Sequence, residues 1–179
     1  MATSIGEPRA IAGLHVAVAK LESLRGAVES AHLHLDIARR IAGTTGIPEI
    51  SRTINLIEAT VHTSAGNVKR ARSANTVAIE HAHREGLVVY LSGLLANAGQ
   101  LALWCGDVSA SRRLLFQAKA TASQLRFHQL GITDSMAALA LFEGNLPEAA
   151  THIQECRRII ASHNVPARSW YDLTHQITK

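Results

Sequence analysis

Residues 87–126 read LVVYLSGLLANAGQLALWCGDVSASRRLLFQAKATASQLR, and the pattern of this stretch recurs along the chain. Apolar residues dominate 87–105, which predicts a buried helix. Gly106 ends this helix, since glycine adopts the left-handed conformation at a helix C-terminus without strain. Asp107 is a natural N-cap, and it predicts a second helix over about 108–125. The stretch therefore predicts an antiparallel pair of helices joined by a short turn.

The turn glycine returns at intervals of 40, 40 and 38 residues, and small residues follow it by five and by twelve positions. A period of this length is typical of one supersecondary unit that is stacked on itself. Small side chains at fixed positions allow paired helices to approach closely. The chain is thus predicted to be an all-α solenoid of antiparallel helix pairs. The recurring positions are Gly26, Gly66, Gly106 and Gly144; Ala31, Ala71, Ser111 and Ala149; and Ala38, Ala78, Ala118 and Cys156.

The repeat also predicts boundaries along the chain. Residues 1–10 are expected to be a flexible N-terminus, and residues 165–179 a capping helix or the start of a fifth repeat. The second helix of the third repeat lacks a glycine at its expected end, where Arg126 stands. We therefore expect a shifted turn between Leu125 and Gly131. The four repeats are expected at about 11–46, 47–86, 87–126 and 127–164.

Composition excludes several classes of protein. Of the 179 residues 47% are hydrophobic, which is enough for a continuous core, but there is no apolar run long enough for a membrane span. The N-terminus has no apolar signal core, so a cytoplasmic location is expected. Cys156 occupies a small-residue position of the repeat and is interpreted as a buried, reduced thiol. The net charge of +4 is compatible with weak nucleic-acid contact.

The repeated residues resemble those of the tetratricopeptide (TPR) family over roughly residues 12–164. The second repeat carries the match at Ala59, Gly66, Asn67, Ala71 and Ala78. Units of 38–40 residues are longer than is usual in that family, and they resemble the sensory arms of MalT-like bacterial transcription activators. The resemblance implies a right-handed superhelix of about four repeats plus a C-terminal helix.

The resemblance also implies a concave groove, lined by the first helix of each repeat, that binds an extended or helical peptide. Asn97 stands where such repeats often place an asparagine that bonds the backbone of the ligand. The alternative at each position is packing against the next repeat. Carried over by repeat position, the lining residues are Val16, Lys20, Ser23, Leu56, Thr60, Thr63, Ala96, Gln100, Leu103, Asp134, Ala138 and Leu141.

Two other groups of residues have alternative readings. Trp104 and Phe142 both stand two residues before the turn glycine, either as aromatic anchors for a ligand or as core packing or a lid over the turn. Basic doublets form either a solvated outer face or a stripe for an acidic partner or nucleic acid. These doublets are Arg39/Arg40, Lys69/Arg70, Arg112/Arg113 and Arg157/Arg158.

Ten histidines raise the question of a metal site. His32 and His34 are two residues apart, as are His81 and His83, and such residues point to nearly opposite sides of a helix. We therefore expect neither a metal nor a cofactor. No catalytic motif is recognisable, so an enzyme is not expected.

Three functions remain open at this point. The first is a non-catalytic protein- or peptide-binding scaffold or adaptor. The second is a ligand-sensing regulatory domain of a larger bacterial transcription activator, and the third is weak nucleic-acid binding on the convex basic face. Self-association through an open end of the stack is a further alternative.

Overall fold

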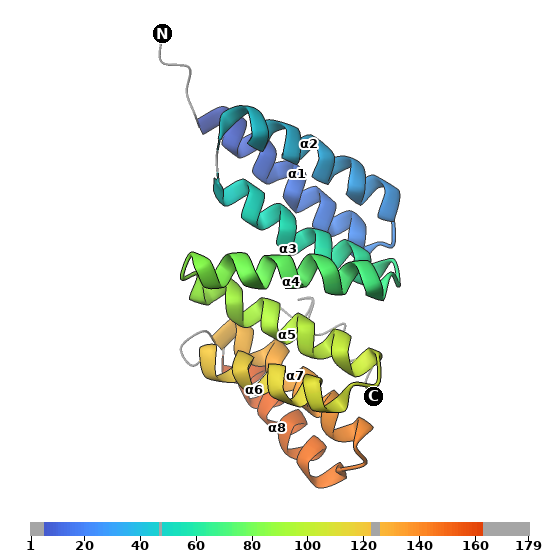
Figure 1. Ribbon diagram of the computed structural model, residues 1–179. Coiled ribbons are helices and arrows are strands. Elements are labelled where there is room, and N and C mark those ends of the chain that lie inside the picture. Colours follow the sequence, from blue (N-terminus) through green and yellow to red (C-terminus); the bar gives the residue numbers. More distant parts are fainter. Residues whose placement is uncertain (1–5, 47, 123–125, 163–179) are drawn as a thin grey trace. The chain divides into compact units, whose positions relative to one another are not determined.

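The computed structural model describes residues 6–46, 48–122 and 126–162. Within these residues the secondary structure consists of eight α-helices and no strand (Figure 1). The all-α prediction is therefore confirmed. The helices are α1 (Gly6–Leu24), α2 (Val28–Thr45), α3 (Pro48–Ser64), α4 (Val68–Arg84), α5 (Val88–Trp104), α6 (Val108–Thr121), α7 (Arg126–Phe142) and α8 (Leu146–Ser162).

The chain divides into two compact units, Met1–His81 and Ala82–Lys179. In the first unit α1 packs against α2 and α3, and α2 packs against α3. In the second unit α5 packs against α6 and α7, α6 against α7, and α7 against α8. Helix pairs are thus formed by α1 with α2, by α5 with α6 and by α7 with α8. The superhelical course of the whole chain stays a prediction.

The turns between helices have the backbone that the repeat predicts. At the end of α3 the N–H of Gly66 donates to the carbonyl of Thr63, and that of Asn67 donates to the carbonyl of His62 at 2.9 Å. This second bond closes the helix end only when the glycine has a positive φ, which is +69° here. The Asn67 side chain then accepts from the N–H of Arg70 and caps α4. The glycines with positive φ are Gly26, Gly46, Gly66, Gly86, Gly106 and Gly144.

Small residues form the contacts between paired helices. The predicted small positions Ala31, Ala38, Ala71, Ala118 and Ala149 are all at most 2% exposed. In the first unit the buried core consists of alanine, valine, leucine and isoleucine side chains from α1, α2 and α3. The second unit has an equally close contact between α5 and α6. There a Cβ added at Gly99 would lie 2.7 Å from Cγ of Leu115.

Two helix boundaries differ from those that the repeat predicts. The N-terminal residues 6–10 belong to α1, whose first turn holds Glu7 and Pro8. An acidic residue interacts favourably with the helix dipole there, and proline loses no helical hydrogen bond in the first turn. The remaining residues of the predicted flexible N-terminus, 1–5, lie outside the described residues, as do residues 163–179, which include the predicted capping segment.

The third repeat also ends earlier than expected. Helix α6 stops at Thr121, and Ala122 takes the C-cap position with its N–H bonded to the carbonyl of Ala118 at 2.9 Å. The expected turn at 125–131 is wrong, because α7 already begins at Arg126. Burial of Leu130 and Ile132 favours the helix over this segment. Helix α6 has 14 residues, whereas α4 and α8 each have 17. The shorter α6 accommodates the shorter interval between the third and fourth turn glycines.

None of the helices in the described part of the chain combines the length and apolarity needed to cross a bilayer.

The close contact between α5 and α6 can be tested with two glycines of the same helix. Gly99→Ala places a methyl group against the fully buried Leu115, and we expect this overpacking to cost about 1–3 kcal/mol, partly offset by about 1 kcal/mol of better helix propensity. Gly93→Ala is the control, because its Cβ would lie 3.6 Å from the His128 ring, an ordinary contact. Chemical denaturation should show a loss of stability only for Gly99→Ala. Equal stability of the two variants would contradict this packing.

A second prediction concerns Ser111, the one non-alanine among the positions five after the turn glycine. Its side chain is completely buried, and its hydroxyl has no hydrogen-bond partner within the described residues. A buried hydroxyl without a partner costs about 1–3 kcal/mol. Ser111→Ala should therefore raise the free energy of unfolding by roughly 1 kcal/mol. A lower free energy of unfolding would mean that the hydroxyl has a partner.

Candidate functional site

The accessible side of α5 carries three residues predicted for the groove. Asn97, Gln100 and Trp104 follow at spacings of three and four residues, which places them on one side of the helix. The two amides are half-buried, whereas the indole is 54% exposed. Much of the rest of the helix is buried, at Ser92, Leu94, Leu95, Gly99, Leu101, Ala102 and Leu103.

The accessible side of α7 carries three more of the predicted residues. Asp134 and Ala138 are half-buried, and Leu141 is exposed. They too follow at spacings of four and three residues and share one side of the helix. Phe142, the last residue of α7, extends this side and is 61% exposed.

The two accessible sides belong to neighbouring helices of one unit. Helix α5 packs against α7, and Oγ of Ser92 lies 2.5 Å from Nδ1 of His128, the third residue of α7. Gly93, one residue further along α5, also has the His128 ring as its neighbour. We call this surface the α5–α7 face and define it by Asn97, Gln100, Trp104, Asp134, Ala138, Leu141 and Phe142.

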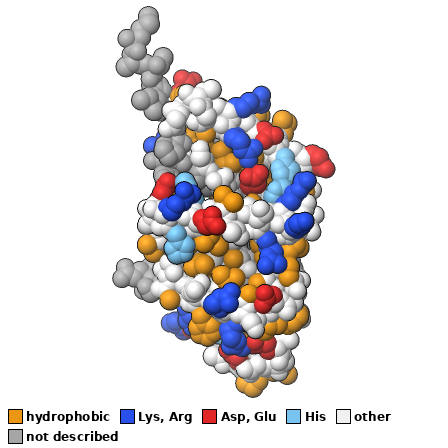
Figure 2. All heavy atoms as spheres, in the orientation of Figure 1, with side chains coloured by type: hydrophobic (Ala, Val, Ile, Leu, Met, Phe, Trp, Pro, Cys, Tyr) orange, Lys and Arg blue, Asp and Glu red, His pale blue; other side chains and the backbone are white. Residues whose placement is uncertain are grey.

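The large aromatic side chains of this face are exposed to solvent. Trp104 and Phe142 end α5 and α7, and more than half of each side chain is accessible. Exposure excludes core packing for both residues, whereas a lid over the turn and an anchor for a ligand both stay open. Leu146, which begins α8, is 65% exposed as well. Hydrophobic side chains are correspondingly visible on the surface in the region of α5–α8, in the lower part of Figure 2.

Some residues predicted for the groove are instead buried between helices. Val16 and Leu103 are 5% and 6% exposed. Ser23 is 1% exposed, and its hydroxyl donates to Oγ of Ser64 at 2.9 Å, across the contact between α1 and α3. These three residues pack the helices together and do not line a surface. Ala96 is half-buried and lies beside Asn97.

The predicted groove residues of the first unit form a surface that is less polar than the α5–α7 face. Lys20 is exposed, and Leu56, Thr60 and Thr63 are half-buried on one side of α3. The hydroxyl of Thr60 donates to the carbonyl of Leu56, and that of Thr63 donates to the carbonyl of Ala59 at 2.8 Å. Because both hydroxyl donors are used inside the helix, this side of α3 mainly presents methyl groups and acceptor oxygens.

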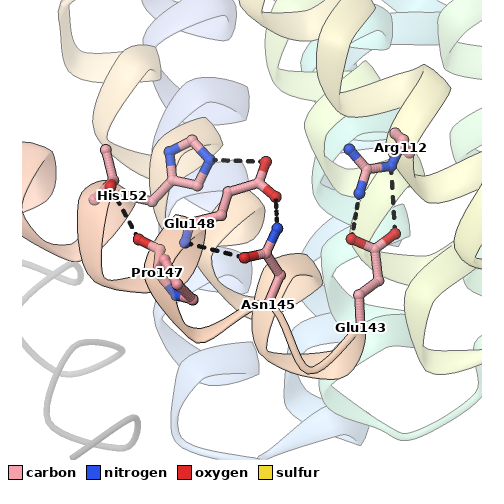
Figure 3. Close-up of polar contacts among 7 residues, drawn as sticks. Arg112, Glu143, Asn145, Pro147, Glu148 and His152 are labelled. Carbon is pink, nitrogen blue, oxygen red and sulfur yellow. Dashed lines mark hydrogen bonds and ion pairs between the residues drawn. The ribbon is translucent and has the colours of Figure 1, made fainter.

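An ion pair that was not predicted lies beside the exposed end of α7. The guanidinium of Arg112 on α6 makes two contacts with the carboxylate of Glu143, which directly follows Phe142 (Figure 3). Arg112 was expected on a solvated outer face or in a stripe for an acidic partner. It is half exposed, so the ion pair contributes at most about 1 kcal/mol, but it restrains the end of α7 relative to α6.

The start of α8 is also held by polar contacts that Figure 3 shows. Oδ1 of Asn145 accepts from the N–H of Glu148 at 3.3 Å, and the Asn145 amide donates to the Glu148 carboxylate at 2.7 Å. The other carboxylate oxygen of Glu148 lies 3.8 Å from Nε2 of His152. The asparagine thus caps α8 as the repeat pattern predicts.

The histidines of α2 face two different helices. Nδ1 of His34 lies 2.8 Å from Nδ1 of His15 on α1, whereas the ring of His32 stacks near that of His62 on α3, with centroids 5.1 Å apart. The prediction that His32 and His34 point apart is therefore confirmed. Within the residues that the structure describes, no group of three metal-ligating side chains is assembled.

The thiol of Cys156 is buried on α8, as predicted, and it forms no disulfide. Burial, followed by the nearby carboxylates of Asp134 and Glu155, raises the pKa of this thiol to about 12. The group therefore stays protonated near neutral pH and is a poor nucleophile. Its position also shows that Asp134 borders the α7–α8 contact as well as the α5–α7 face.

Comparison with known proteins found no family model and no curated protein that matches this chain. The resemblance to tetratricopeptide repeats therefore stays a prediction from the repeated residues.

Three partly buried histidines predict how stability depends on pH. Burial lowers the pKa of His62, His128 and His152 below the ordinary 6.5. The unfolded chain then binds more protons than the folded chain once the pH falls below about 6.5, so stability is lost on acidification. Denaturation between about pH 7.5 and about pH 5 should show this loss, and His62→Gln or His128→Gln should reduce it. His83→Gln, at an exposed position, is the control and should keep the wild-type slope.

Proposed function

We propose that this protein is a non-catalytic scaffold that binds a protein or peptide partner on the α5–α7 face. The observation that carries the proposal is the exposure of Trp104 and Phe142 at equivalent ends of two neighbouring helices, beside the amides of Asn97 and Gln100. Exposed aromatic side chains are typical anchors of protein interfaces. Side-chain amides can donate to and accept from a peptide backbone at the same time.

The chemistry of the face indicates the kind of partner. Ala138 leaves room between larger side chains, and Leu141 adds an exposed aliphatic surface. Asp134 is the only carboxylate among the residues that define the face. An apolar segment in an extended or helical conformation, with one or two large side chains as anchors, fits such a surface better than a highly charged one.

The right-handed superhelix of TPR-like repeats is part of this proposal, and so is the cytoplasmic location. The repeat period and the six left-handed turn glycines support this arrangement.

The alternative of a ligand-sensing regulatory domain is favoured by a different observation. A polar pocket lies between α3 and α4, away from the side of α3 predicted to line the groove. Nucleic-acid binding has less support, because several arginines of the basic doublets are already paired with carboxylates. Arg39 pairs with Asp36 and Glu58, and Arg158 pairs with Glu155.

The proposal predicts that Trp104→Ala weakens peptide binding strongly. Peptides would be selected from a random display library against the wild-type protein, and the affinity of the best peptide would be measured by calorimetry. Loss of an aromatic anchor should cost about 2 kcal/mol or more, and loss of both amides in Asn97→Ala/Gln100→Ala about 1–3 kcal/mol.

Leu14→Ala is the matched control, because Leu14 is 64% exposed on α1 in the other unit. It should bind the peptide as the wild type does, and circular dichroism should show that all variants remain folded. If Trp104→Ala and the double variant both keep the wild-type affinity, the α5–α7 face is not the binding surface.

A further inference from the structure

A polar pocket with a volume of about 270 Å³ opens between α3 and α4. Helix α3 contributes residues at spacings of three and four, and so does α4, so each helix lines the pocket with one side. The residues from α3 are buried or half-buried, whereas Arg70, Ser73 and Val77 of α4 are exposed. The pocket is lined by Asn55, Glu58 and His62 from α3 and by Arg70, Ser73, Ala74 and Val77 from α4.

The pocket lies on a different side of α3 from the predicted groove. At about 100° per residue, the directions of Glu58 and Thr60 differ by about 160°. A peptide along Leu56, Thr60 and Thr63 would therefore leave the pocket open. The pocket is a separate site, and a function for it goes beyond peptide binding.

One positively charged side chain that lines the pocket, Arg70, is available to bind a ligand. The carboxylate of Glu58 shares Arg39 of α2 with Asp36, since Nη2 of Arg39 lies 3.2 Å from Oε2 of Glu58 and Nη1 lies 2.6 Å from Oδ1 of Asp36. The guanidinium of Arg70 makes no hydrogen bond or ion pair with any described residue, although the backbone N–H of Arg70 donates to Oδ1 of Asn67. The exposed hydroxyl of Ser73 lies one turn further along α4. The hydrogen-bond donors of the Arg70 guanidinium are therefore available to a ligand at the rim of the pocket.

The base of the pocket holds a neutral imidazole. His62 is 9% exposed, and burial lowers its pKa, followed by the repulsion from His32. Arg70 acts in the same direction, whereas Glu58 acts in the opposite one. A neutral imidazole offers one N–H donor without the desolvation cost of a buried charge.

We propose that this pocket binds the oxyanion group of a small organic molecule, either a carboxylate or a phosphate. Arg70 supplies a planar pair of N–H donors that fits either group, and Ser73 and Asn55 supply further donors. Val77, which is 52% exposed, contacts the uncharged remainder of the ligand. The size of the pocket limits this remainder to a few atoms beyond the anionic group.

The test is a titration of the full chain followed by nuclear magnetic resonance of the arginine Nε–H and histidine side-chain signals. Inorganic phosphate and acetate are added in separate titrations, with sodium chloride keeping the ionic strength constant. The Arg70 and His62 signals should shift with saturation. Tighter binding of phosphate would assign the ligand to phosphate esters, and tighter binding of acetate would assign it to carboxylates.

Two arginine variants of the same helix make the test specific. Arg70→Gln should weaken binding roughly 10- to 100-fold, the effect of losing a charged hydrogen-bond partner. Arg72→Gln removes the same charge at an exposed position outside the pocket, and it should bind as the wild type does. Because both residues are exposed, neither variant should impair folding.

Three results would overturn the proposal. The first is a shift that never saturates, and the second is equal weakening by Arg70→Gln and Arg72→Gln, since either would mean diffuse attraction to positive charge. The third is a saturable shift with ethylammonium chloride but with neither anion. This result would make Glu58 the binding group and would mean that the site binds cations. Loss of peptide binding in Trp104→Ala would leave all of these outcomes unaffected.

Discussion

The close approach of paired helices is the constraint on which the rest of this protein depends. A single α-helix pair of this length cannot bury its apolar side unless the two backbones come near each other, and small residues at fixed positions permit this. At Gly99 even a methyl group would meet the buried Leu115. The contact leaves little of α5 accessible, and the residues that remain on its surface are therefore those available for binding.

The accessible parts of α5 and α7 include large apolar side chains, as do those of the neighbouring helices at Phe116 and Leu146. Trp104 and Phe142 are exposed where most apolar residues of these helices are buried. The exposed area of these two aromatic side chains adds no hydrophobic free energy to folding, because it is in water in the unfolded chain as well. The ion pair between Arg112 and Glu143 and the Asn145 cap restrain the end of α7 and the start of α8, next to the buried Leu139 and Ala140.

Polar interactions in the first unit join helices that are distant in sequence. Arg39 reaches Glu58, and His32 reaches His62, so that α2 contributes to the surroundings of a pocket whose walls belong to α3 and α4. Arg39 also pairs with Asp36, so it offsets the charge of Glu58 only in part. Helix α3 thus has a mostly apolar side, at Leu56, Thr60 and Thr63, and another side that lines the pocket.

Local patterns were sufficient for most of the fold. The glycine period and the polar residues after it predicted the helix pairs, their caps and the left-handed turns, because each depends on the backbone preferences of a few adjacent residues. The end of α6 was misplaced, since burial of Leu130 and Ile132 extends α7 across an expected turn. Contacts between helices decided which of the predicted groove residues are accessible, such as Asn97 and Trp104, and which are buried, such as Ser23. The pairing of Arg112 with Glu143 and the pocket on α3 and α4 also depended on these contacts, because they join side chains whose distance apart is set only when the helices pack.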